Sequence, residues 1–196
     1  MCKKIGFVFV LIIFLFVSLS AQVAASFDTE DVDEYVTNYI EKNGLPGAAI
    51  VIVKDGKVLY QKGFGHDSDG NPITAISKIG LASGTKPFTA FAVLQLVDEG
   101  KIKLDNPIVD YLPELTLDDD RWKEVTVRQL LSHTSGLPNP TIVAPANTLK
   151  EGVERFHDWK LQSDPGEKYY YSNANYWTLA YLVEQMSGMK FNEYLT

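Results

Sequence analysis

One hairpin of apolar, β-branched residues limits the folds open to this chain more than any other feature. The two β-rich runs are Ala48–Val53 and Val58–Phe64, and Asp55-Gly56 between them is a strong signal for a tight hairpin turn. Two strands do not make an independently stable sheet unless helices cover them. We therefore expect a mixed α/β chain of the α+β type, with an antiparallel sheet flanked by helices and a buried first strand.

The remaining ordered stretches have apolar residues at helical spacing. In the first and second stretch this spacing predicts that Tyr35, Tyr39 and Phe88 face inward. Asp28 or Thr29 is the expected cap of the first helix, and a glycine follows the first, second and last helices as a stop signal. The expected helices are Asp28–Asn43, Thr85–Glu99, Val127–His133, Thr148–Trp159 and Asn173–Ser187, with Leu104–Asp120 irregular.

Composition excludes several classes of function. The chain has 196 residues, is 45% hydrophobic and carries a net charge of −7, and it has no basic stretch interleaved with aromatic residues, so we expect no nucleic-acid partner. Cys2 is the only cysteine, which excludes an internal disulfide and a cysteine zinc site. His66, His133 and His157 are scattered along the sequence. We therefore expect no metal and no cofactor.

The first 25 residues have the pattern of a signal peptide. Lys3 and Lys4 precede an apolar run from Ile5 to Leu19, which is shorter than a membrane span, and small residues lead up to Ala25. We predict cleavage after Ala25 and export of residues 26–196, either secreted or periplasmic. The alternative is an uncleaved N-terminal anchor, and the membrane is expected as a partner only through this segment.

Ser83-Gly84-Thr85-Lys86 is the first candidate for chemistry. A hydroxyl and an amine three residues apart at a helix start share one face of the helix. A neutral amine can accept the proton of a serine hydroxyl and so activate it as a nucleophile. The alternative interpretation is an ordinary helix cap beside a solvated lysine.

Tyr171-Ser172-Asn173, at the start of the last long helix, is the second candidate. A phenol whose pKa is lowered by a nearby lysine can relay a proton, and a carboxamide can hydrogen-bond a substrate carbonyl and orient the lysine. The alternative is a tyrosine-rich edge of the core with Asn173 as a helix cap.

These motifs, together with several dispersed blocks, resemble the serine β-lactamase-related proteins of the penicillin-recognising superfamily. The resemblance is to the branch of class C β-lactamases, D-alanyl-D-alanine carboxypeptidases and esterases. It covers nearly all of residues 26–196, in matching order and spacing. The blocks are Gly44–Ala49, Ala82–Ala90, Leu96–Leu104, Tyr111–Leu115, Val125–Pro138, Pro165-Gly166 and Tyr171–Asn173.

The resemblance implies an acyl-enzyme mechanism on an amide or ester: a β-lactam, a D-Ala-D-Ala peptide or a simple ester. Ser83 would be the acylated nucleophile, Lys86 its proton acceptor, Tyr171 the general base and acid, and Asn173 a substrate contact. The Ser83 N–H would be one oxyanion donor. The expected partner is therefore a small molecule or peptide with a reactive carbonyl.

The second oxyanion donor comes, in this family, from a later strand, and no such motif follows Asn173. We therefore expect residues 26–196 to be the N-terminal portion of a β-lactamase-related domain whose C-terminal strands are missing. As this fragment it would be inactive or poorly folded, with the hairpin as an aggregation site. The alternatives are a non-catalytic binding or scaffold remnant of the fold, and a truncated or split gene.

Two weaker signals are interpreted as structural. Asp67–Asn71 begins like a calcium loop, but Pro72 and Lys78 replace its required glycine and glutamate, so we expect a surface turn. The run from Ser132 to Ser135 places a serine beside His133, but neighbours in a turn do not face one another. We expect His133 to be a structural turn residue.

Overall fold

The computed structural model describes residues 28–140 and 146–196 and divides into two compact units, the first ending at Gly80 and the second spanning Leu81–Thr196. The predicted signal peptide, residues 1–25, lies outside the described residues. In the part of the chain that is described, no helix combines the length and apolar character needed to cross a membrane.

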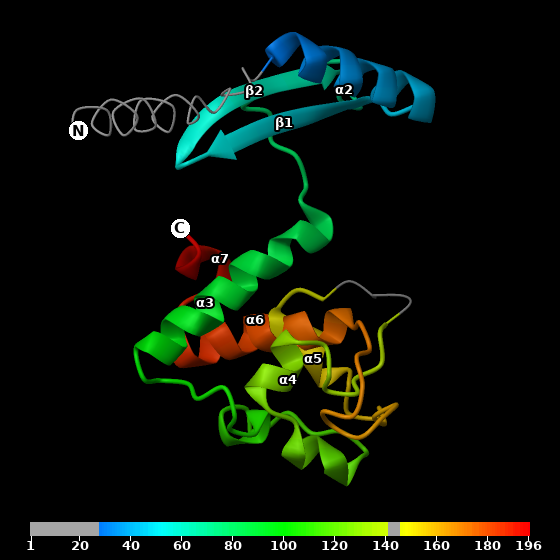
Figure 1. Cartoon of the computed structure of the whole chain (residues 1–196). Coiled ribbons are helices and arrows are strands. Elements are labelled where there is room, and N and C mark those ends of the chain that lie inside the picture. Colours follow the sequence, from blue (N-terminus) through cyan, green and yellow to red (C-terminus); the bar gives the residue numbers. More distant parts are fainter. Residues whose placement is uncertain (1–27, 141–145) are drawn as a thin grey trace, which may run out of the picture. The chain divides into compact units, whose positions relative to one another are not determined.

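The described residues of the first unit, from Asp28 onward, form one helix on one hairpin (Figure 1). Helix α2 (Thr29–Asn43) begins at the cap Asp28, whose carboxylate accepts the Glu30 amide, and ends at Gly44 with a φ of 61°. Strands β1 (Gly47–Lys54) and β2 (Lys57–Gly65) pair antiparallel through a turn in which Asp55 and Gly56 both have positive φ. The predicted helix and hairpin are both confirmed.

The expected burial of the first unit is wrong in part. Side chains alternate between the two faces of a strand, and α2 covers only one of them. On the covered face Tyr60 and Lys62 contact Asp33 of α2. On the other face Val51 and Val53 are 62% and 57% exposed, so β1 is not buried as predicted. On α2 itself, Tyr35 and Tyr39, expected to face inward, are exposed and stack on each other.

A turn follows the hairpin. The Asp67 carboxylate accepts hydrogen bonds from the backbone amides of Asp69 and Asn71, and the Asp67 amide bonds the Asn71 carbonyl. This carboxylate is occupied in closing the chain on itself, as expected for a surface turn.

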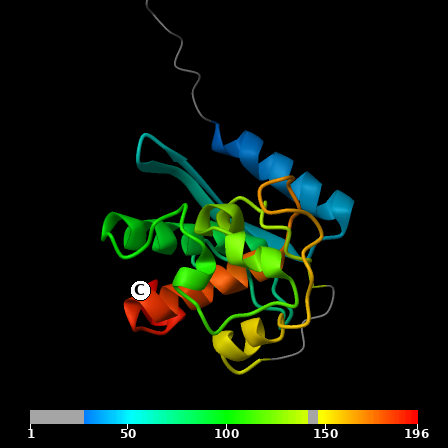
Figure 2. The ribbon, with the colours of Figure 1, turned by 90° about the horizontal axis from the view of Figure 1, so that it is seen from below.

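The second unit is helical, and its longest helix, α6 (Asn173–Ser187), lies at its centre (Figure 1). Helix α6 contacts α3 (Lys86–Asp98), α4 (Val127–Leu131), α5 (Leu149–Glu154) and α7 (Phe191–Tyr194). Figure 2 shows α6 between α4 and α5. Three short 3₁₀ helices complete the described part of this unit: η1 (Ala82–Thr85), η2 (Ile108–Asp110) and η3 (Asp120–Glu124).

The core of this unit lies between α3, α6 and the irregular segment that joins α3 to α4. Ala92, Val93 and Leu96 of α3 are fully buried, as are Leu179 and Leu182 of α6. One residue departs from expectation. Phe88, predicted to face inward, is 54% exposed, because α3 is apolar on most of its circumference and the neighbouring helices of this unit cover only one side.

A charged cluster ties two irregular segments of the second unit together. The Arg121 guanidinium donates to the Asp119 carboxylate at 2.6 Å, to Asp164 at 2.7 Å and to the Leu161 carbonyl at 2.8 Å. Hydrogen bonds from Arg121 outweigh burial and hold the pKa of Asp119 well below its usual value. The cluster fixes residues 161–164, from which the chain leads into the second predicted motif.

Candidate active site

The first motif lies where η1 runs into α3. Ala82, just before Ser83, has a φ of 46°, which is uncommon for a residue other than glycine. Such backbone conformations are concentrated at functional sites. One helical turn further, the Lys86 amine donates to Ser83 Oγ at 3.2 Å. The predicted shared face of hydroxyl and amine is confirmed.

The second motif comes from the extended chain that enters α6. The Tyr171 hydroxyl lies 2.9 Å from Ser83 Oγ, and the Lys86 amine donates to Asn173 Oδ1 at 2.8 Å. The Tyr171 hydroxyl also donates to Asn173 Oδ1, at 3.4 Å. All four residues singled out in the sequence therefore meet in one hydrogen-bonded cluster, although its two halves are 88 residues apart.

Asn173 is not the helix cap that the alternative interpretation required. The cap of α6 is Ser172, whose Oγ accepts the Ala174 amide at 3.2 Å. Since Ser172 supplies the cap, the Asn173 side chain is available to Lys86. The backbone amide of Asn173 donates to Asn139 Oδ1 at 2.9 Å. Asn139 is a residue that the sequence did not single out.

The two tyrosines beside Lys86 have pKa values shifted in opposite directions. The Lys86 amine lies 5.0 Å from the centre of the Tyr171 ring and 5.5 Å from that of Tyr176. Hydrogen bonds to Lys86 and Ser83, together with the lysine charge, lower the pKa of Tyr171. Burial raises the pKa of Tyr176, whose hydroxyl donates to a backbone carbonyl at 3.0 Å. Of the two phenols, Tyr171 is thus the one whose proton is released more readily.

His133, which follows α4, contacts the second motif at Ser172. It has a φ of 59° in the turn after α4, which agrees with its predicted role as a turn residue. Its Nδ1 accepts the Ser172 amide at 3.2 Å and lies 3.0 Å from the Asn175 carboxamide. The neighbouring Ser135 hydroxyl donates to Asn175 instead of contacting the imidazole. No local sequence signal indicated these contacts, because each joins residues about forty positions apart.

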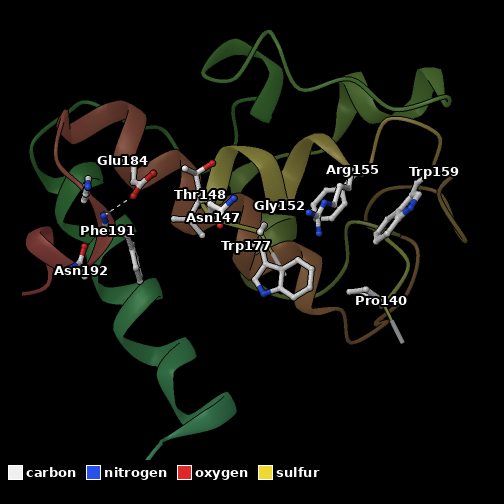
Figure 3. Close-up of a pocket in the computed structure, with 14 residues that line it drawn as sticks. Pro140, Asn147, Thr148, Gly152, Arg155, Trp159, Trp177, Glu184, Phe191 and Asn192 are labelled. Carbon is white, nitrogen blue, oxygen red and sulfur yellow. Dashed lines mark hydrogen bonds between the residues drawn. The ribbon is translucent and has the colours of Figure 1, made fainter. Parts of the chain in front are cut away.

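A separate cavity of about 810 Å³ lies beside α6 (Figure 3). Trp177 and Glu184 of α6, Gly152 of α5 and Phe191 of α7 contribute to its wall. None of the four clustered residues is among the described residues that line it. The cluster at Ser83 therefore remains the candidate for bond cleavage. Among the described residues, no three or more His, Cys, Asp or Glu side chains are grouped to hold a metal ion.

A hydroxyl held between an amine and a phenol defines a site suited to acyl transfer through a serine. Comparison with known proteins agrees with that class, since the Beta-lactamase family model matches residues 32–196. The chain belongs to this family, which includes serine hydrolases.

Three relatives illustrate the match. Protein flp of Staphylococcus aureus is 30% identical over 175 residues, covering 85% of this chain and 35% of that protein. The structure of an octameric penicillin-binding protein homologue from Pyrococcus abyssi is 30% identical with a TM-score of 0.71, covering 86% of this chain and 41% of that one. A β-lactamase/D-alanine carboxypeptidase from Pseudomonas syringae is 25% identical with a TM-score of 0.70, covering 83% and 45%. The chain thus spans less than half the length of these relatives.

Proposed function

We propose that the protein is a serine hydrolase that cleaves an amide or ester through an acyl-enzyme on Ser83. The observation that carries this proposal is the pair of contacts at Ser83 Oγ, with the Lys86 amine at 3.2 Å and the Tyr171 hydroxyl at 2.9 Å. Both distances lie within reach of proton transfer.

In the first half of the reaction, Ser83 Oγ attacks the substrate carbonyl while a neutral Lys86 amine takes its proton. The Ser83 N–H is proposed to stabilise the oxyanion of the tetrahedral intermediate. As the intermediate collapses, the bond to the leaving group breaks and Tyr171 gives that group its proton. The acyl-enzyme then carries a Lys86 ammonium beside a Tyr171 phenolate, an ion pair that the short contacts of this cluster favour.

In the second half, a water molecule attacks the acyl carbonyl and the Tyr171 phenolate takes the water proton. The bond from carbonyl carbon to Ser83 Oγ breaks, and the Lys86 ammonium returns a proton to the serine. All groups then regain their starting states. Asn173, bonded to Lys86 at 2.8 Å, is proposed to orient this amine and to contact the substrate.

The proposed substrates are β-lactams, D-Ala-D-Ala peptides and simple esters, all of which present a reactive carbonyl to a serine. The names of a penicillin-binding protein homologue and a β-lactamase/D-alanine carboxypeptidase among the relatives support the first two. The described residues after Asn173 form helices α6 and α7, without a strand to supply a second oxyanion donor. One lost donor costs roughly a hundredfold to a thousandfold in turnover, so we propose that these 196 residues alone turn over poorly.

We propose further that the protein is exported, on the strength of the basic start and apolar run in residues 1–25. An intact mass that begins at Ser26 would support cleavage. A mass that retains Met1 in a membrane fraction would favour an anchor.

Labelling with two probes, a fluorescent penicillin and an activated ester, tests the reaction. We expect Ser83→Ala to abolish labelling and the matched control Ser132→Ala to retain it, because Ser132 Oγ donates to the Arg128 carbonyl and lies 2.9 Å from the Thr134 hydroxyl. Labelling that survives in Ser83→Ala would overturn the proposal. A wild-type protein that neither probe labels would favour the non-catalytic scaffold instead.

A further inference from the structure

The mechanism above leaves one buried titratable group of the site unused, the imidazole of His133. It is 8% exposed, and His133 contacts the second motif at two points and the preceding residue, Tyr170, at a third. Its Nδ1 accepts the Ser172 amide at 3.2 Å, its backbone carbonyl accepts the Tyr170 amide at 2.8 Å, and its ring centre lies 4.6 Å from that of Tyr171. His133 therefore holds the chain on both sides of the phenol.

These partners determine the protonation of the ring. A backbone amide can only donate, so Nδ1 of His133 must present a lone pair to Ser172. The Asn175 carboxamide turns its nitrogen to the same Nδ1, because its oxygen accepts the Ser135 hydroxyl at 2.6 Å. With two donors on Nδ1, the imidazole is neutral and carries its proton on Nε2.

The surroundings resist protonation of this ring. The groups that face it are the Lys86 side chain from α3, the Tyr169 and Tyr171 phenols from the segment that leads into α6, and the Tyr176 phenol from α6. Burial and the lysine charge lower the pKa of His133. A proton on Nδ1 would point at the N–H groups of Ser172 and Asn175, and it would break the hydrogen bond from the Ser172 backbone amide.

The segment that His133 holds carries Tyr171, which contacts Ser83, and Asn173, which contacts Lys86. Ser172 lies between Tyr171, 2.9 Å from Ser83 Oγ, and Asn173, 2.8 Å from the Lys86 amine. A shift of the Ser172 backbone therefore moves both neighbours. Misplacement by about 1 Å can cost roughly a hundredfold in rate.

We propose that His133 is a positioning residue for the acyl transfer: its neutral imidazole accepts the Ser172 amide and thereby sets the distances from Tyr171 and Asn173 to Ser83 and Lys86. This proposal rests on the proposed function. Its role is separate from catalysis, since the ring contacts the tyrosine and the backbone and is not bonded to the serine hydroxyl.

NMR spectroscopy on the native protein tests the protonation state of His133 and does not depend on enzymatic activity. In ¹⁵N-histidine-labelled protein, the His133 resonances are assigned by their absence in His133→Asn. We expect the shifts of the Nε2–H tautomer at neutral pH and a protonation midpoint below that of a free imidazole. A proton on Nδ1 at neutral pH would overturn the proposal.

Two variants test the positioning. His133→Asn places an amide oxygen near the position of Nδ1 and tolerates a positive φ, whereas His133→Phe keeps an aromatic ring and loses the acceptor. We expect Ser172 amide exchange to stay slow in the asparagine variant and to accelerate in the phenylalanine variant. We also expect the phenylalanine variant to be acylated roughly a hundredfold more slowly at an unchanged probe affinity, with most of the rate retained by asparagine.

The outcomes separate the two proposals. Equal acylation of wild type and a folded His133→Phe variant would overturn the positioning role while leaving the hydrolase intact. A wild type that is not acylated would overturn the proposed function, and Ser172 exchange would then decide whether His133 holds the motif. If His133→Phe does not fold, the tautomer in the wild type and the exchange rate in His133→Asn decide.

Discussion

Replacing Tyr171 by phenylalanine removes one oxygen from the centre of the proposed mechanism. That oxygen lies 2.9 Å from Ser83 Oγ and 3.4 Å from Asn173 Oδ1. The ring remains, and with it the contact to His133 at 4.6 Å and to the Lys86 amine at 5.0 Å. We therefore expect the variant to fold and to bind the probe as the wild type does.

The expected loss is that of a positioned proton donor and acceptor. Such groups contribute about a hundredfold to ten-thousandfold in rate, or about 3 to 5 kcal/mol in activation free energy. Tyr171→Phe should lower acylation and deacylation within this range. Tyr170→Phe is the matched control, since both side chains are similarly exposed, at 38% and 37%, and only Tyr171 is bonded to the serine.

The pH dependence has a definite sign. Tyr171 must carry its proton to release the leaving group, so acylation should fall as the pH rises through its pKa, which lies below the usual tyrosine value. This alkaline limb should vanish in Tyr171→Phe.

The assay is the acylation rate measured against probe concentration, which separates rate from affinity. The reasoning is refuted if Tyr171→Phe is acylated as fast as Tyr170→Phe, or if the alkaline limb survives in it.

Three further predictions follow from named contacts. Asn173→Ala frees the Lys86 amine that it holds at 2.8 Å, and should slow acylation roughly tenfold or more without lowering the melting temperature; an unchanged rate would contradict this. Asp119→Asn weakens the guanidinium cluster and should cost about 1 to 3 kcal/mol in denaturant unfolding. Because the pKa of Asp119 is depressed, the wild type should lose this stability only as the pH falls below the usual aspartate range, and the variant should not. Gly63→Ala should destabilise the first unit, since a Cβ would lie 2.1 Å from a backbone oxygen, whereas Gly80→Ala, with nothing within 4 Å, should not; equal melting curves would contradict this.

Local signals predicted α2 and α6 well because their caps are local. The helices expected over Val127–His133 and Thr148–Trp159 end earlier, at Leu131 and Glu154. Asp28 caps α2, and Gly44 and Gly188, both with positive φ, follow α2 and α6. Burial was predicted less well, since it depends on what covers an apolar face. Val51 lies in an apolar run and Phe88 stands at helical spacing with apolar residues, and both are nevertheless exposed.

The same difference between local and long-range contacts applies to the prediction of the site. A spacing of three on a helix predicted that Ser83 and Lys86 meet. Tyr171 was singled out by the chemistry of a phenol near a lysine. Its assignment to the same site as Ser83 rested on the resemblance, because no periodicity links residues 88 positions apart. Asn139 and Asn175 escaped prediction altogether. Asn139 bonds the second motif and Asn175 bonds His133, and both contacts depend on how the segment after α4 packs on α6. A lone asparagine has no pattern that indicates such a contact.

The central claim is that Ser83 becomes acylated. Its most direct test is peptide mapping by mass spectrometry of the protein, purified from its source, after brief incubation with a penicillin and separately with an activated ester. The account predicts one acyl group, located on Ser83 by fragmentation and absent from Ser83→Ala. An adduct on another residue, or an unmodified Ser83 with both probes, would contradict it.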